Sequence, residues 1–308
     1  LSVLMVCLLA ACAGKQRGTP DNEPTLKTLA GRTVNVVKDP GVPIQPAQAI
    51  AAYNSFLAVA PRAPQREEAM RRIGDLEMNS ADLRSEDAQA TGAPDYRAAA
   101  ARYQDVLKTF PNSPGNDRVL YQLARAQEQG GDLEAALKTL DRLVKDYPAT
   151  ALQEEAQFRR GELLFTARNY ASAEKAYATV LQKGAASRYH DRALYMQGWS
   201  QFKQGKLDEA VQSFFGVLDL KLAGRADAGA LETLDGLSRA DRELVEDTFR
   251  VTSLGLTNLK GAESIAPYIQ SPERQAYAFR VYEQLGELYL KQERVKDALR
   301  EFEDHDSP

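Results

Sequence analysis

The sequence predicts an all-α fold in which pairs of antiparallel helices repeat along the chain as a solenoid. The first observation is that four alanines recur with a constant spacing of 37 residues, and the second is that large apolar residues follow each alanine at +4 and +7. The third is that a glycine or alanine precedes three of these alanines by 12 residues. A fixed period of this size indicates stacked supersecondary units. The recurring residues are Ala99, Ala136, Ala173 and Ala210, with Ala124, Gly161 and Gly198 before the last three.

The composition agrees with a soluble helical protein and excludes one broad class of function. Of the 308 residues, 44% are apolar and 27% are charged, which is typical of a folded soluble chain. Alanine is abundant and β-branched residues are scarce outside 32–44, which favours helix. The formal net charge is −4. Because a general nucleic-acid surface needs a basic face, we expect no nucleic-acid partner.

The N-terminus resembles a lipoprotein signal. Residues 1–11 form an apolar run with the length of a signal-peptide h-region, too short to span a bilayer. The tetrad Leu9–Cys12 resembles the bacterial lipobox, which implies that Cys12 is acylated and becomes the first residue after cleavage. The alternative is an ordinary signal peptide with an incidental cysteine. In Gram-negative lipoproteins an aspartate after the cysteine marks retention in the inner membrane. Ala13 therefore implies the periplasmic face of the outer membrane, with acyl chains as the anchor.

A flexible, disordered tether is expected over 12–46, where glycines and prolines interrupt any regular element. A flexible chain of this length has a root-mean-square span of about 30 Å. Because no Met or basic segment precedes the apolar run and no capping helix closes the array, we expect the natural protein to extend at both ends.

The repeat array is expected over 47–220. It opens on a second-type helix, marked by Ala49, Tyr53 and Phe56, that has no first-type helix before it. In the next unit the small residue Gly74 lies 25 residues before its alanine instead of 12, so 13 extra residues fall near 79–94. This polar insertion is expected to form a loop or a helix extension.

Helix ends and the remaining elements follow from local signals. Prolines at 111 and 148 stop second-type helices, and 130–132 and 204–206 form turns within pairs. An irregular helical segment is expected over 221–270, where Ser238 with Asp241 predicts the start of a helix over about 239–260. The repeat pattern returns over 271–308, at 285–289 and at Ala298 and Phe302, and stops before that unit is complete.

The pattern resembles the tetratricopeptide repeat family, in which each repeat is a helix A followed by a helix B. The resemblance implies a right-handed superhelix whose concave face is lined by helix A. Three columns of helix A residues are then expected to form an aromatic groove with charged edges that binds an extended peptide or a helix. The alternative is that the aromatic residues pack between neighbouring helices. The predicted groove residues are Tyr121, Arg125, Phe158, Glu162, Phe165, Tyr195, Trp199 and Phe202.

The sequence carries no constellation that predicts catalysis. It has no phosphate-binding glycine loop, no nucleophile elbow and no zinc-protease motif. The only cysteines are Cys7 and Cys12, and His190 and His305 stand alone, so no metal site and no cofactor are expected. We expect a non-enzyme whose partners are envelope proteins and the membrane, with no small-molecule substrate.

The lipobox together with the repeats resembles outer-membrane lipoproteins with a BamD-like domain. The junctions Phe110–Pro114 and Asp146–Pro148 resemble the aromatic-proline junctions of that group. Similar junctions occur in the periplasmic repeat protein of the Tol–Pal division machinery. The resemblance implies a periplasmic scaffold in outer-membrane protein assembly. Two alternatives stay open: a cell-wall or division coordinator of the Tol–Pal type, and a non-catalytic part of a larger protein with an enzyme domain beyond residue 308.

Overall fold

The computed structural model describes residues 45–87, 93–222, 224, 231 and 234–293, and every regular element in them is a helix. The predicted signal peptide, Cys12, the tether before 45, and the residues Ala298 and Phe302 lie outside these residues. In the described part of the chain no helix is both long and apolar enough to cross a membrane. The α-helices are α1 (Pro46–Val59), α2 (Arg66–Glu86), α3 (Arg97–Thr109), α4 (Asn116–Gln129), α5 (Leu133–Asp146), α6 (Gln153–Thr166), α7 (Tyr170–Leu181), α8 (His190–Lys203), α9 (Leu207–Leu222), α11 (Arg239–Asn258), α12 (Pro272–Ala276) and α13 (Ala278–Lys291).

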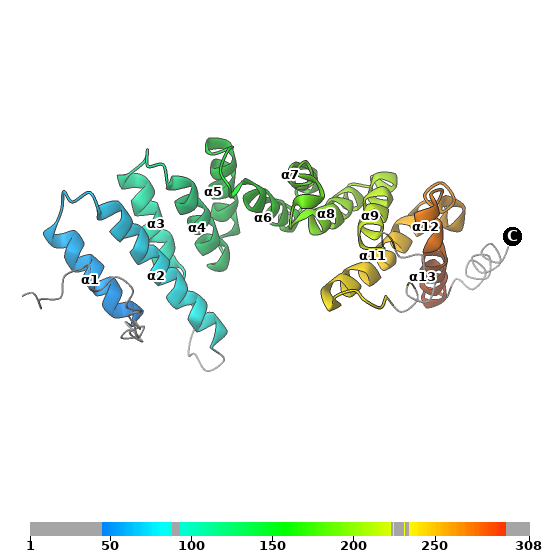
Figure 1. Cartoon of the computed structure of the whole chain (residues 1–308), viewed down its shortest axis with the longest axis horizontal. Helices are drawn as coiled ribbons and strands as arrows, with labels where there is room; N and C mark the ends of the chain where they lie inside the picture. Colours follow the sequence, from blue (N-terminus) through cyan, green and yellow to red (C-terminus); the bar gives the residue numbers. More distant parts are fainter. Residues whose placement is uncertain (1–44, 88–92, 223, 225–230, 232–233, 294–308) are drawn as a thin grey trace, which may run out of the picture. The chain divides into compact units, whose positions relative to one another are not determined.

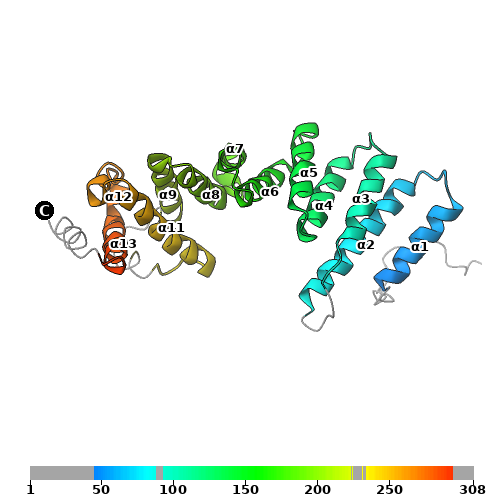
Figure 2. The ribbon, with the colours of Figure 1, turned by 180° about the vertical axis from the view of Figure 1, so that it is seen from behind.

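Helices that are neighbours in the sequence are neighbours in space (Figures 1 and 2). The four complete helix pairs are α2/α3, α4/α5, α6/α7 and α8/α9. The second helices α3, α5 and α7 also pack against the first helix of the next pair, and α9 packs against α11. The predicted all-α fold of repeated helix pairs is therefore confirmed. The expected turns are present as well, with Gly131 and Gly205 in the left-handed backbone conformation that glycine adopts most easily.

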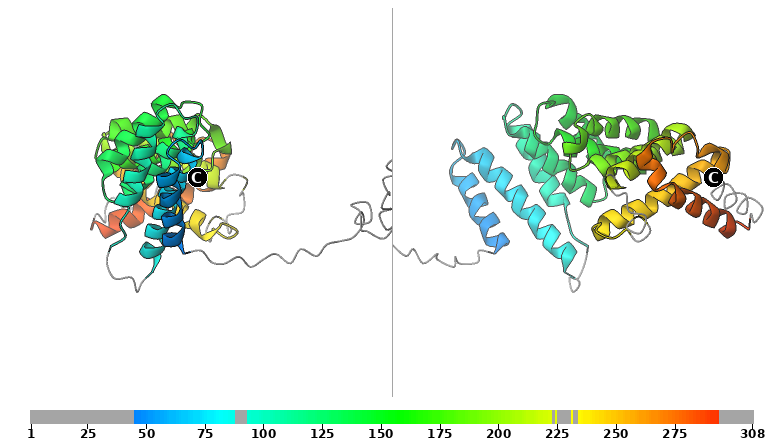
Figure 3. Two further views of the ribbon diagram at one scale, coloured as in Figure 1. Left: turned by 90° about the vertical axis from the view of Figure 1, so that its left-hand side faces the viewer. Right: turned by 45° about the vertical axis from the view of Figure 1, so that its right-hand side comes forward.

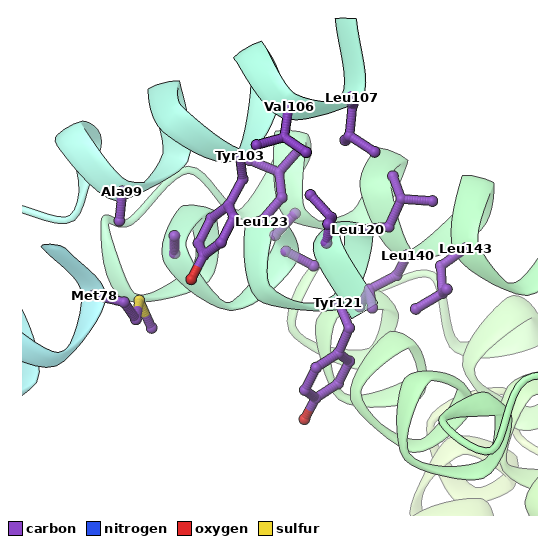
Figure 4. Packing of buried hydrophobic residues seen from close by; sticks show 14 of the residues in the cluster. Met78, Ala99, Tyr103, Val106, Leu107, Leu120, Tyr121, Leu123, Leu140 and Leu143 are labelled. Carbon is purple, nitrogen blue, oxygen red and sulfur yellow. The ribbon is translucent and has the colours of Figure 1, made fainter. Parts of the chain in front are cut away.

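The repeated apolar positions form the interior of the pairs. Each of the four recurring alanines has an exposed fraction of 0%, and the residues at +4 and +7 are exposed by 1% or less. Figure 4 shows this interior around α3 to α5, where Val106, Leu120 and Leu140 lie in one cluster. The residues that recur every 37 positions in the sequence are thus the buried residues of successive second helices.

The small residue of helix A makes its close contact with an aromatic ring of helix B. A Cβ added at Gly161 would lie 2.6 Å from Cε1 of Tyr177, which is shorter than real Cβ contacts. Gly74 with Tyr103 and Gly198 with Phe214 repeat this arrangement. The pair α4/α5 instead has Ala124, and the residue at the aromatic position is Leu140. Glycine is therefore needed where a ring lies against the first helix, and alanine suffices where a leucine does.

The insertion near 79–94 begins as a helix extension. Helix α2 continues to Glu86, and Ala81 on this extension is buried. Tyr96, which precedes α3, donates its hydroxyl hydrogen to Asp82 Oδ1 over 3.1 Å. Residues 88–92 lie outside the described part of the chain, so the structure describes the predicted insertion over 79–87 and at 93–94.

The segment after α9 packs back on the array without forming a regular pair. Helix α11 starts at the predicted N-cap, where the Ser238 hydroxyl accepts a hydrogen bond from the Asp241 amide, and it ends at Asn258. A short 3₁₀ helix, Gly261–Ser264, follows in place of a full partner helix. Arg274 of α12 forms a bidentate ion pair with Asp219 of α9, with Nη2 2.7 Å from Oδ2. This pair and the Tyr277 hydroxyl on the same carboxylate hold the C-terminal helices against α9.

Candidate functional site

A groove with a cavity of about 550 Å³ lies between the first helices of two successive pairs, α2 and α4. Its size is sufficient for several side chains of a bound segment. Helices α2 and α4 supply most of its walls, because equivalent faces of successive first helices lie on the same side of the array. The residues that line it are Arg71, Asp75, Met78, Asn79, Asp82, Tyr103, Arg118, Val119, Tyr121, Gln122, Arg125 and Leu152.

The α2 wall of the groove is held by charged hydrogen bonds. Arg71 Nη1 donates to Asp75 Oδ2 over 3.2 Å, and Arg71 Nε donates to Glu68 Oε2 over 3.1 Å. The buried Tyr103 hydroxyl donates to Asp75 Oδ1 over 2.9 Å. These bonds fix the side chains of the wall and leave little charge on it unpaired.

The α4 wall differs because its arginines are loosely paired. Arg125 Nη2 lies 3.8 Å from Asp82 Oδ2, near the limit of an ion pair. Arg118 is exposed and has no ion pair or side-chain hydrogen bond with any residue that the structure describes. A guanidinium in this position can form bidentate hydrogen bonds to a carboxylate. The groove therefore offers its best anchor for an acidic side chain at Arg118.

Tyr121 closes the groove toward α6. Its hydroxyl donates to Glu155 Oε1 and accepts from Arg159 Nε over 3.0 Å, and Arg159 Nη1 lies 3.3 Å from Glu128 Oε2. Burial and the Glu155 carboxylate raise the pKa of Tyr121 to about 12, so the hydroxyl stays protonated. Burial alone would raise the pKa of Glu155, but the hydrogen bond from Tyr121 and the charge of Arg159 outweigh it and the pKa is lowered. This network ties α4 to α6.

The predicted groove residues on α6 serve packing between helices. Phe158 is 2% exposed and stacks on Tyr189, with ring centroids 5.0 Å apart. Phe165 is half-buried and meets Tyr170 of α7 edge to face at 5.2 Å. Glu162 forms an ion pair with Arg192 of α8 at 3.3 Å. Phe158 therefore has the packing role that the sequence left as the alternative to partner contact.

The predicted groove residues on α8 dock the irregular segment. The Tyr195 hydroxyl donates to Asp247 Oδ2 of α11, and burial together with that bond raises its pKa to about 12. Trp199 lies edge-on to Phe202 at 5.6 Å and to Phe214 at 6.2 Å. These half-buried rings join a cluster that contains Val251 of α11. They connect two parts of the array.

Of the eight predicted groove residues, the structure brings Tyr121 and Arg125 to the groove and distributes the others along the helix interfaces. From the sequence, Arg71 and Asp75, together with Glu68 and Arg72, are interpreted as a solvated face of the first helix A, and Arg118 is not singled out. Because of the 13-residue insertion, α2 lies 50 residues before the equivalent positions of α4. With that shift Arg71 occupies the position of Tyr121, and Asp75 occupies that of Arg125.

The groove holds no catalytic or metal-binding constellation among the described residues. No group of three or more His, Cys, Asp or Glu side chains in the described ranges is placed to hold a metal ion. The groove's polar groups are arginines, carboxylates and amides, and its hydroxyls belong to tyrosines that bond to carboxylates. Its chemistry fits the binding of a polypeptide segment.

Comparisons with known proteins agree with this architecture. Two family models, each described as tetratricopeptide repeat, match residues 90–157 and 154–220. The chain therefore contains tetratricopeptide repeats over 90–220, a range that takes in helices α3 to α8 and nearly all of α9. Because such repeats bind protein partners, they make the chain a scaffold for protein–protein interaction. No curated protein matches the sequence.

Several solved structures are similar in fold. A tetratricopeptide repeat protein from Parabacteroides merdae is 16% identical, with 84% of this chain and 85% of that chain covered and a TM-score of 0.46. The protein MamA is 19% identical over 56% of this chain and 87% of its own, with a TM-score of 0.43. BtubC from P. vanneervenii is 14% identical over 83% and 91%, with a TM-score of 0.43.

Proposed function

We propose that this protein is a lipid-anchored scaffold on the periplasmic face of the outer membrane, where it holds an envelope protein close to that membrane. The anchor is Cys12, on the strength of the Leu9–Cys12 motif, and the repeats supply the binding surface. The observation that carries the binding part is the α2/α4 groove with Arg118, which forms no ion pair with any residue that the structure describes. The partner contributes an extended segment with an acidic side chain that bonds to Arg118.

The anchor is tested by membrane fractionation of the full chain. Cys12→Ala should move the protein from the membrane pellet to the soluble fraction, because two or three acyl chains are needed for stable anchoring. Cys7→Ala is the matched control, since Cys7 lies in the cleaved apolar run, and it should stay in the pellet. Retention of the Cys12→Ala protein in the membrane would rule out this anchor.

The groove is tested by affinity capture from detergent-solubilised envelopes with quantitative mass spectrometry. Arg118→Glu should reduce recovery of the partner at least about tenfold, because it replaces the attraction for an acidic side chain with repulsion. Arg142→Glu, which makes the same charge change on an exposed face of α5, should leave recovery unchanged. Equal recovery with both variants would contradict the groove as the binding site.

The same measurement distinguishes the pathways. Capture of outer-membrane assembly components in an Arg118-dependent manner would support a role in outer-membrane protein assembly. Arg118-dependent capture of cell-wall synthases or Tol–Pal proteins would instead support a division coordinator. In both outcomes the scaffold function stands, and the identity of the Arg118-dependent partner sets the pathway.

A further inference from the structure

The contact between the first helices α6 and α8 is filled by two stacked rings. Phe158 of α6 and Tyr189, the residue before α8, have ring centroids 5.0 Å apart and an angle of 24° between their planes. Arg192 of α8 lies over the Phe158 ring, 5.1 Å from its centroid, and donates to Glu162 Oε1 over 3.3 Å. This contact is therefore closed by a pair of rings together with an arginine–carboxylate pair.

The same positions between α2 and α4 carry different residues. The first helices follow one another along the array (Figures 1 and 3), so each position of the α6/α8 contact has an equivalent at α2/α4. In place of the two rings, α2/α4 has Arg71 and Gly115. Arg118 is the equivalent of the arginine that lies over the ring. One ring position is therefore occupied by a guanidinium, and the other has no side chain.

The space beside Gly115 is open. A Cβ added at Gly115 would meet no heavy atom within 4 Å outside its immediate chain neighbours. A second cavity of about 650 Å³, called here the Gly115 cavity, is lined by Gly115, Arg71 and Arg118 among others. Arg71 and Arg118 also line the groove, so the two spaces adjoin. The Gly115 cavity is large enough for the side chain that Tyr189 contributes to the α6/α8 contact.

The walls of the Gly115 cavity match the charge distribution of an aromatic ring. Arg71 donates to Glu68 and Asp75, so its guanidinium is held in one plane. A guanidinium stacks on the negative face of a ring, whereas carboxylates attract the positive edge. The carboxylates that line the cavity belong to Glu67, Glu68 and Asp117, and each already accepts a hydrogen bond. The cavity therefore favours a neutral aromatic ring over a charged group.

Arg118 supplies the second half of the contact. In α6/α8 its equivalent, Arg192, lies over a ring and also bonds to Glu162, one turn along α6 from that ring. Arg118 is exposed and forms no ion pair or side-chain hydrogen bond with any residue that the structure describes. A bound segment with a carboxylate near its ring would give Arg118 the kind of partner that Arg192 has.

We infer that the groove and the Gly115 cavity together recognise a segment of another protein in which an aromatic residue lies close to an acidic one. The ring enters the Gly115 cavity and stacks on Arg71, and the carboxylate bonds to Arg118. This inference rests on the proposed binding role of the groove and adds an aromatic anchor to it.

The chain itself has no free ring to offer. Residues 1–44 contain no Phe, Tyr or Trp. Every Phe, Tyr and Trp among the described residues is buried or half-buried, so the described part of a second copy presents no exposed ring either. Phe302 is the one remaining aromatic residue. The repeat pattern assigns it to position +4, where the residues of α3, α5, α7 and α9 are at most 1% exposed. Because Glu301 and Glu303 flank Phe302, the experiments include it as the internal competitor.

Selection from a random peptide library tests this chemistry without knowledge of the partner. Dodecapeptides displayed on phage are selected on the full chain, and those that also bind the Arg118→Glu protein are removed. The remaining peptides should carry an aromatic residue beside an acidic one, or one residue from it, at least about tenfold more often than the unselected library.

The outcomes of the selection separate the inference from the proposed function. Arg118-dependent peptides that are rich in acidic residues but not in aromatic ones would overturn the aromatic anchor, and the groove would keep its proposed role. A selection that yields no Arg118-dependent peptide would contradict both.

Two substitutions at Gly115 locate the ring. Gly115→Tyr should lower the affinity for a selected peptide at least about tenfold, because the new ring fills the cavity as Tyr189 fills its place in α6/α8. Gly115→Ala is the matched control and should change the affinity by less than about twofold, since a Cβ has room there. Fluorescence polarisation measures the affinities, and circular dichroism checks the helix content of each variant. Equal affinities of the two variants would overturn the placement of the ring.

A substitution at Phe302 tests the source of the ring. If Phe302 of the same chain or of a second copy filled the Gly115 cavity, its removal would free the cavity and raise the affinity for the selected peptide. Phe302→Ala in the full chain should leave that affinity unchanged, because another protein supplies the ring. A rise in affinity in Phe302→Ala would overturn the assignment to another protein.

Discussion

Helices α4 and α8 carry equivalent residues of the repeat, and the molecule uses them in different ways. Tyr121 and Tyr195 both donate a hydrogen bond to a carboxylate two helices further along the chain, Glu155 of α6 in one case and Asp247 of α11 in the other. One turn further, Arg125 of α4 lines an open groove, whereas Trp199 of α8 packs on Phe214. The repeat register fixes where a side chain points, and the neighbouring helix decides whether that point is a surface or an interior.

The largest loss of stability is expected from removing the ring of Phe158, which the sequence analysis predicted to line the groove. Phe158→Ala should lower the free energy of unfolding by about 3–5 kcal/mol, because it empties a fully buried aromatic site between α6, α7 and α8. The urea midpoint followed by circular dichroism measures it. Trp199→Ala, at a half-buried ring, should cost less, about 2 kcal/mol. If Phe158→Ala instead left stability unchanged and weakened partner capture, Phe158 would belong to the binding surface.

The sequence was sufficient for the fold because the repeat is set by buried residues. A small residue of helix A and an alanine of helix B recur at a fixed spacing, so the helix pairs could be predicted, and local glycines and Ser238 were sufficient for the turns and the helix start. The groove could not, since a helix A residue can face either a neighbouring helix or solvent without any change in its own identity. The sequence allows Phe158 and Trp199 to be binding residues, and only the structure shows that Phe158 is covered by Tyr189 and that Trp199 is half-buried against Phe214.

A smaller loss of stability is expected from changing the contact between Gly161 and the ring of Tyr177. Gly161→Ala should destabilise the α6/α7 pair by about 1–3 kcal/mol, because the new Cβ would lie 2.6 Å from Tyr177. Gly161→Ala combined with Tyr177→Leu should recover part of that loss, since Ala124 with Leu140 is a working version of the same contact in α4/α5. A double-mutant cycle measures the coupling. If the losses of stability in Gly161→Ala and Tyr177→Leu simply added in the double variant, the contact with the Tyr177 ring would not be the reason for a glycine at 161.

The smallest loss of stability is expected from removing the tyrosine–carboxylate hydrogen bond that α4 and α8 each form. Tyr121→Phe should cost about 1 kcal/mol at neutral pH, because Glu155 and Arg159 each lose a partner. The pKa of Glu155 is lowered in the folded protein, so its stabilising contribution is present above its unfolded pKa of about 4.3 and is lost as the pH falls through the folded value. The difference between Tyr121→Phe and the parent protein should therefore shrink as the pH is lowered below about 4.3. Urea midpoints at neutral pH and at a series of acidic pH values measure this. If the stability difference between Tyr121→Phe and the parent protein stayed constant in acid, Tyr121 would contribute through packing, as Trp199 does in α8. The hydrogen bond to Glu155 would then not contribute to stability.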